Sequence, residues 1–262
     1  GETLDVIIGI VGIDDTEEFD PFLMLDAFDA DNPDDYIKGF PWHPHRGIET
    51  VTYLIEGEME HGDSLGNTGT IFGGGCQWMT AGSGIIHQEM PQPSDLMLGT
   101  QLWVNLPKKD KMTHPAYRDI TVDQVPLIKE EGTEVRVVSG SYKGTDGPVS
   151  GDYVKTLYLD VKLDTNTEFV LERPREETLF LYIVRGSIHT DNKEVPYHRA
   201  VLFGEGDELR LKAGEEGARF FLYSALPLKE PIAWAGPIVM NSREELSLAR
   251  EELSQGTFIK HN

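Results

Sequence analysis

The sequence predicts a mostly β protein built from short strands, and three observations support this prediction. Residues 48–55 read I-E-T-V-T-Y-L-I, and strands favour such β-branched and aromatic residues. Glycines recur between 69 and 84, as turn residues do between the short strands of sandwiches and barrels. Residues 181–186 (L-Y-I-V-R-G) resemble residues 53–57 (Y-L-I-E-G), so the second half should echo the architecture of the first.

In the first half, the strand at 48–55 is followed by a bend at 56–58 and by a hairpin turn at 63–67, where Asp, Ser, Gly and Asn gather. Further strands of this half are expected at 68–72, 76–80, 85–90 and 98–106. Residues 107–132 are less regular and contain several Pro and Lys residues, so we interpret them as the connection between the halves.

β signals resume in the second half. Strands are expected there at 134–139, 155–163, 167–172, 178–184, 200–203, 207–211 and 218–224. The tail differs, because Ser242 and Glu245 form a capping-box pattern that marks the start of a helix. Leu246, Ala249 and Leu253 follow at helical spacing, so we expect one amphipathic helix at about 243–254.

The composition argues against several classes of function. The net charge is −22, from 45 acidic and 23 basic residues, and such a surface repels phosphate backbones and anionic lipid. We therefore expect no direct nucleic-acid binding and no membrane association, and no apolar run approaches the ~20 residues that span a bilayer. Cys76 is the only cysteine, which excludes an intramolecular disulfide and Cys-rich zinc sites. The expected location is cytoplasmic, with the nucleus open if the source is eukaryotic.

Two pairs of polar residues are the strongest functional signal: His43 with His45, and His87 with Glu89. Each pair has one residue between its members, and residues i and i+2 of a strand point to the same face. On neighbouring strands they would bring three imidazoles and one carboxylate to a common point, a set that suits a divalent first-row metal such as iron. The competing interpretation, core histidines with satisfied hydrogen bonds, explains a lone histidine better than two such pairs.

Longer motifs surround these pairs and resemble the pirin family. They read F-P-W-H-P-H-R-G-I-E-T-V-T-Y-L-I-E-G, D-S-L-G-N, Q-W-M-T-A-G-S-G-I-I-H-Q-E-M-P and Q-L-W-V-N-L-P. The resemblance runs from about Asp20 to Ile259 and is strongest over 40–107. Pirins are two-domain members of the cupin superfamily. The resemblance therefore implies an all-β fold of two jelly-roll β-barrels packed together, with a short C-terminal α-helix.

The resemblance also implies how the chain is divided and where the metal lies. Residues 1–120 would form an N-terminal metal-binding cupin domain, 133–240 a C-terminal cupin domain without metal ligands, and 241–262 a helix and tail. The family's ligand pattern falls on His43, His45, His87 and Glu89. One divalent ion per chain is expected, with Fe(II) first and Mn, Ni, Co, Cu or Zn as alternatives.

Two functions follow from the resemblance. Family members have been associated with a quercetin 2,3-dioxygenase activity, which implies an iron-dependent dioxygenase acting with O2 on a flavonol or a related enolic or phenolic compound. Glu89 would then have a second role as the catalytic base that accepts the substrate's hydroxyl proton. The alternative is a metal-loaded regulatory protein that binds a protein partner without turnover. Oxygen consumption with quercetin separates the two.

Candidates for the substrate pocket are apolar or amide side chains near the proposed ligands. They are Trp42, Trp78, Met79, Gln101, Trp103 and Phe22. Trp42 stands beside a ligand and is the better candidate. The other apolar candidates, Trp78, Met79, Trp103 and Phe22, could equally fill the core. We expect backbone carbonyls, Glu49 or Gln101 to orient the imidazoles. Many cupins use a Glu at the position of Glu49 as a ligand, but the pirin pattern uses Glu89 instead.

Overall fold

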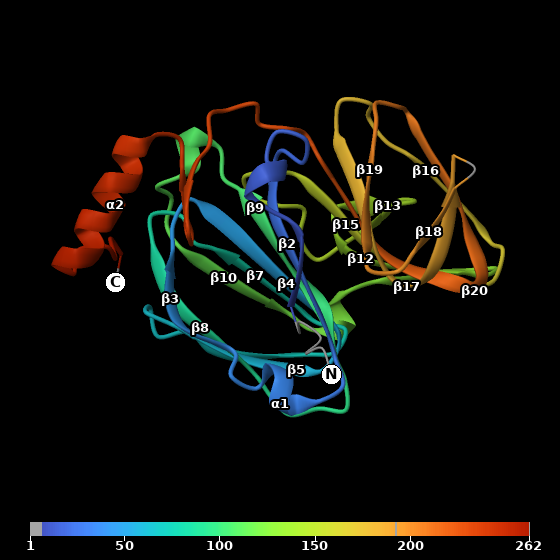
Figure 1. Cartoon of the computed structure of the whole chain (residues 1–262), viewed down its shortest axis with the longest axis horizontal. Helices are drawn as coiled ribbons and strands as arrows, with labels where there is room; N and C mark the ends of the chain where they lie inside the picture. The colour runs from blue at the N-terminus through green and yellow to red at the C-terminus, as the bar shows by residue number, and fades with distance from the viewer. Residues whose placement is uncertain (1–6, 192, 262) are drawn as a thin grey trace. The chain divides into compact units, whose positions relative to one another are not determined.

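The computed structural model describes residues 7–191 and 193–261 and divides them into two compact units (Figure 1). The first unit takes the described residues up to Glu17, then Phe22–Val122, and those from Leu228 onward. The second unit takes Glu18–Pro21 and the described part of Asp123–Pro227. Residues 228–240, which we grouped with the second half, thus lie in the first unit. Strands dominate both units, as the sequence predicts.

Two larger antiparallel sheets form most of the first unit. The six-stranded sheet has the order β1 (Ile7–Val11), β2 (Phe22–Ala30), β9 (Met97–Asn105), β4 (Ile48–Glu56), β7 (Cys76–Thr80) and β10 (Ala116–Ile120). The four-stranded sheet has the order β3 (Phe40–His45), β8 (Ile85–Pro91), β5 (Glu58–Asp63) and β6 (Thr68–Phe72). Apolar side chains of Ile48, Met79, Ile85 and Trp103 meet in one buried cluster, which joins the two sheets face to face.

The chain after Leu228 completes the first unit. It forms the hairpin β21 (Ala233–Ala235) and β22 (Ile238–Met240) and then α2 (Arg243–Gln255), drawn in red in Figure 1. The Ser242 side chain accepts the backbone N–H of Glu245, whose carboxylate accepts the N–H of Ser242, so the capping box and the helix are confirmed. Buried Lys111 clamps this tail by donating from Nζ to the carbonyl oxygens of Gly47 and Val239, at 2.8 and 2.9 Å.

In the described residues, the second unit contains one eight-stranded antiparallel sheet and a separate two-stranded sheet. The order of the larger sheet is β11 (Leu127–Glu130), β12 (Thr133–Ser139), β15 (Thr156–Leu163), β20 (Glu208–Ala225), β17 (Thr178–Thr190) and β18 (Lys193–Pro196). Further pairings come from β16 (Glu168–Glu172) on β20, β19 (Arg199–Phe203) on β17, and β13 (Ser141–Tyr142) with β14 (Thr145–Asp146). Long strands that bend at register shifts, such as β17 between Ile183 and Ile188, let this sheet curl around an apolar core.

The interpretation of 107–132 as an irregular connection is wrong in two places, because β10 and β11 lie in it. Both strands are short and half exposed, so their pairing depends on neighbouring strands rather than on a local pattern. The sequence also missed the short helix α1 (Pro33–Tyr36) and three 3-10 turns, η1 (Ile13–Asp15), η2 (Lys108–Asp110) and η3 (Val122–Gln124). Within the described ranges, neither helix has the length and apolar character that crossing a bilayer requires.

Candidate metal centre

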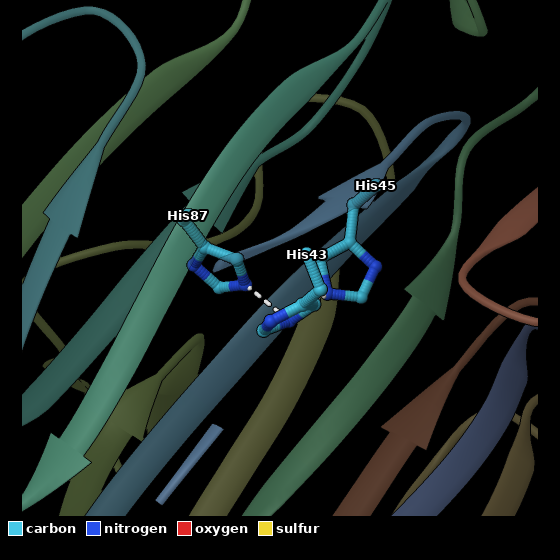
Figure 2. A group of neighbouring side chains, drawn as sticks. All are labelled: His43, His45 and His87. Atoms are coloured by element: carbon cyan, nitrogen blue, oxygen red, sulfur yellow. Dashed lines mark hydrogen bonds between the residues drawn. The ribbon is translucent and has the colours of Figure 1, made fainter. Parts of the chain in front are cut away.

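Three imidazoles converge in the first unit. His43 and His45 lie on β3, and His87 lies on β8 directly opposite His43 in the antiparallel register. Figure 2 shows the three rings turned toward one another from these two strands. The Nε2 atom of His43 is 3.0 Å from Nε2 of His45 and 2.9 Å from Nε2 of His87. The i, i+2 spacing on one strand and the pairing of two neighbouring strands thus bring three potential ligand atoms to one point.

The other nitrogen of each ring is held in place by a hydrogen-bond partner. Nδ1 of His43 donates to the Pro41 carbonyl at 2.8 Å, and Nδ1 of His45 donates to the Pro237 carbonyl at 3.1 Å. Nδ1 of His87 lies 2.9 Å from the Tyr117 hydroxyl. Because a carbonyl oxygen only accepts, Nδ1 of His43 and of His45 carries a proton, and in a neutral ring this leaves the lone pair on Nε2. Metal-bound histidines are oriented in this way.

The environment keeps two of the imidazoles neutral. Burial, together with the adjacent His87 and His43, lowers the pKa of His45 to about 3. Burial, with His43 and His61 nearby, also lowers the pKa of His87 to about 3. A histidine must be unprotonated to bind a metal, so both rings are ready to act as ligands at neutral pH.

The spacing of the nitrogen atoms fits a shared cation. Nε2 of His43 and Nε2 of His45 face each other at 3.0 Å, a separation at which one cation can lie between the two nitrogens. Two nitrogens bound at ~2.1 Å to one ion, at right angles, would lie about 3.0 Å apart. The group of His43, His45 and His87 could therefore hold a metal ion, and imidazole suits several divalent first-row metals.

Glu89 lies beside the three imidazoles and is tied to the opposite sheet. It follows His87 by two residues on β8, and its Oε2 atom is 3.8 Å from Nε2 of His87. Its Oε1 atom accepts hydrogen bonds from Gln101 Nε2 at 2.7 Å and from Thr52 Oγ1 at 3.2 Å. One carboxylate oxygen is thus positioned by the six-stranded sheet while the other faces the imidazoles. Its role as a fourth ligand remains a prediction.

The imidazoles of His43 and His45 open onto a cavity of about 340 Å³. Besides His43, His45 and Glu89, its walls include Met24, Asp26, Phe40, Gln101, Trp103 and Pro237. Of the pocket candidates from the sequence, Gln101 and Trp103 line this cavity. Trp42 is 54% exposed and lines a different groove, with Gln88 and Met90. Phe22, Trp78 and Met79 are buried.

Several residues of this site carried no signal in the sequence. Tyr117, which holds His87, lies on β10 in the segment read as a connection, and its ring stacks on His61 at 5.2 Å. Pro237, which holds His45, lies 192 residues further along the chain. Glu49 is buried and accepts a hydrogen bond from Thr80 at 2.7 Å, and Gln101 contacts Glu89 rather than an imidazole. The expected backbone carbonyls hold two of the three rings.

Comparison with known proteins places the chain in a family. The family model for pirin matches residues 6–104, and the model for the pirin C-terminal cupin domain matches residues 158–259. A pirin-like protein of Caulobacter vibrioides is 43% identical over 252 residues, which cover 95% of this chain and 91% of that protein. The chain belongs to the pirin family. The pirin of Homo sapiens is 40% identical over 248 residues, covering 91% of this chain and 83% of that protein.

A solved structure of a similar protein agrees with the fold. The crystal structure of a quercetin 2,3-dioxygenase from Acinetobacter baumannii has a TM-score of 0.88 and 33% identity. It covers 96% of this chain and 91% of that chain. This pirin is therefore the all-β protein that the sequence predicts, with two cupin jelly-roll domains and a short C-terminal helix.

Tyr117 gives a test of the candidate metal site. Tyr117→Phe removes the hydroxyl that contacts His87 Nδ1 and keeps the ring that stacks on His61. Loss of such an outer hydrogen bond typically weakens metal binding by about 10- to 100-fold, and we expect a loss in that range. Competition with a fluorescent chelator measures it. Tyr197→Phe, at an exposed tyrosine of the second unit, is the matched control, and equal metal affinity in both variants would contradict the assignment.

We expect the protein to keep its fold when any bound metal is removed, so a metal-dependent activity would be lost before the fold. The large apolar core of the second unit and the cluster around Phe28, Leu54 and Met97 in the first unit contain none of the three histidines. Burial of such clusters, rather than an ion, supplies most of the stability of a domain of this size. After chelation, far-ultraviolet circular dichroism should keep its β signal and a cooperative thermal transition. A metal-free protein that is unfolded at room temperature would refute this.

Proposed function

We propose that the protein is a metal-dependent dioxygenase that acts on a flavonol, or a related enolic or phenolic compound, with O2 as co-substrate. One observation carries the proposal: three imidazoles and a carboxylate lie together, and three of these four side chains line a cavity that has flat apolar sides. The relative from Acinetobacter baumannii bears the name quercetin 2,3-dioxygenase, which supports the same reaction class. Fe(II) is the proposed metal, because imidazole and carboxylate bind it and it can react with O2.

Different residues would bind the aromatic substrate and the metal ion. Phe40 and Trp103 offer apolar surfaces to an aromatic ring, and burial of those surfaces excludes water from the site. His43, His45, His87 and Glu89 would hold the ion, which supplies Lewis acidity and one-electron redox chemistry when bound.

Glu89 has a further role in this proposal. Its Oε1 atom is fixed by Gln101 and Thr52, which leaves Oε2 on the side of the imidazoles. There Oε2 accepts the proton of the substrate hydroxyl, and the electron pair of the O–H bond stays on the substrate oxygen. The deprotonated substrate is an anion, and a divalent ion held by the imidazoles would favour its binding through opposite charge.

Oxygen uptake tests the proposal. Protein reconstituted with Fe(II) under anaerobic conditions is mixed with quercetin and oxygenated buffer in a sealed electrode cell. We expect uptake of one O2 per quercetin consumed, at a rate well above that of an equal concentration of free Fe(II). Zinc-loaded protein is the matched control, because zinc has no redox chemistry. Uptake equal to that of free iron would overturn the dioxygenase and leave the metal-loaded regulatory protein as the better reading of the same site.

A further inference from the structure

Asp26 is a charged residue in the wall of the cavity that the proposed reaction leaves without a role. It lies on β2, where alternate side chains face opposite sides of the sheet. Leu23 and Leu25 are 1% and 0% exposed and pack in the core, whereas Met24 and Asp26 turn toward the cavity. Asp26 thus lies on a strand of the six-stranded sheet and lines the same cavity as two of the imidazoles, which lie on β3.

Gln101, the cross-strand neighbour of Asp26, has no N–H group left to donate to the Asp26 carboxyl group. Asp26 pairs in register with Gln101 on β9. The Trp103 indole N–H, which can only donate, contacts Gln101 Oε1 at 3.1 Å and so fixes the orientation of the amide. Gln101 Nε2 then donates to Glu89 at 2.7 Å and to Thr52 at 3.0 Å. Both N–H groups of this amide are used on the side away from Asp26.

The carboxyl group of Asp26 therefore needs a hydrogen-bond donor from outside the described part of the chain. Among the residues that the structure describes, no hydrogen bond or ion pair reaches it. Burial raises the pKa of Asp26 to about 6, so the group is still mostly ionised at neutral pH. A half-buried carboxylate without a donor lowers stability, and groups of this kind cluster at binding and catalytic sites.

The chemistry of the other walls defines what can satisfy Asp26. The described lining of the cavity contains no Lys or Arg, so an anionic substituent would find no countercharge there. The indole N–H of Trp103 already donates to Gln101, and Phe40 and Met24 offer only apolar surface. A ligand must then bring its own hydrogen-bond donors, and a hydroxyl group on an aromatic ring is a donor that is compatible with flat apolar walls.

We propose that Asp26 is a substrate-binding residue whose carboxylate accepts a hydrogen bond from a second hydroxyl of the aromatic substrate, remote from the hydroxyl that faces the imidazoles. This inference rests on the proposed function and narrows its substrate class. The substrate is a polyhydroxylated aromatic compound, such as a flavonol with hydroxyls on two separate rings, and it carries no carboxylate, sulfate or phosphate on the part that enters the cavity.

Binding to redox-inert protein tests the inference apart from turnover. Zinc-loaded wild type, Asp26→Asn and Asp26→Leu are titrated with quercetin and with 3-hydroxyflavone, which lacks the remote hydroxyls. Quenching of tryptophan fluorescence, to which Trp103 in the cavity contributes, reports binding. Asp29→Asn is the matched control, because Asp29 lies three residues further on the same strand and on its opposite face. Zinc content is measured in every sample.

Wild type should bind quercetin about 10- to 100-fold more tightly than 3-hydroxyflavone, the range for a hydrogen bond to a charged group. Asp26→Leu should abolish this preference by weakening quercetin alone, and Asp26→Asn should reduce it, because the amide oxygen accepts without charge. If Asp26→Leu weakens the binding of both ligands equally, the role of Asp26 is merely structural. If the preference for quercetin is unchanged, Asp26 does not contact the ligand. Either result overturns the inference.

The binding and oxygen-uptake experiments together separate the inference from the proposed function. Loss of the preference in Asp26→Leu, without oxygen uptake by the iron form, would overturn the proposed function alone. Oxygen uptake with an unchanged preference would overturn the inference alone.

Discussion

Replacement of His43 or His87 by Ala should remove the metal from the protein. Each change deletes one of the Nε2 atoms that meet at 2.9 Å and leaves fewer than three imidazoles in the cluster. The metal affinity should fall by more than the ~100-fold that loss of an outer hydrogen bond costs. Elemental analysis of protein purified without a histidine tag should find about one metal per chain in wild type and only traces in either variant.

The control for this experiment is His189→Ala. His189 lies on β17 of the second unit, and its side chain is 45% exposed, so its loss should leave the metal content unchanged. Stoichiometric metal in both His43→Ala and His87→Ala would show that the ion binds elsewhere. Retention of metal in only one variant would identify the other histidine as the stronger ligand and would keep the site.

Glu89→Gln should lower the rate of turnover per bound iron by about 10²- to 10⁴-fold, the usual cost of losing a general base. Glutamine preserves the shape of the side chain and an oxygen that can accept from Gln101 and Thr52. It cannot accept the substrate proton at neutral pH. The variant should therefore bind iron less tightly but fail mainly in catalysis. Oxygen uptake and iron content must be measured on the same reconstituted samples.

Glu60→Gln provides the comparison for this substitution. Glu60 lies on β5 with an exposed side chain, so its neutralisation changes the net charge equally without touching the cavity. If Glu89→Gln, Glu60→Gln and wild type all show the same turnover per bound iron, then Glu89 does not act as a base.

Local pattern predicted much of the fold and the core of the site. The strands expected at 68–72 and 76–80 are β6 and β7, because side-chain alternation and turn residues are short-range features. The meeting of His43, His45 and His87 needed only one further assumption, that the two strands are neighbours.

The rest of the site depends on contacts that no local pattern marks. Tyr117 and Pro237 reach the imidazoles from 30 and 192 residues away, and their partner atoms are a hydroxyl and a backbone carbonyl, which many residues can supply. Asp26 was missed for another reason. It follows F-L-M-L on a strand that reads as core, and only the register with Gln101 shows that it faces the cavity.

The carbonyl of Pro237 that orients His45 has a consequence for the biosynthesis of the protein. Domains generally fold as units while the chain leaves the ribosome. The second unit is almost continuous in sequence, so it can fold as soon as Pro227 has emerged, whereas the first unit still lacks its β21–β22 hairpin at that moment. The hydrogen bond that orients His45 cannot form until Pro237 has been synthesised, 192 residues later. Metal loading of the candidate site would then be a late event, and ribosome-stalled chains should acquire tight metal binding only after residue 237 leaves the exit tunnel.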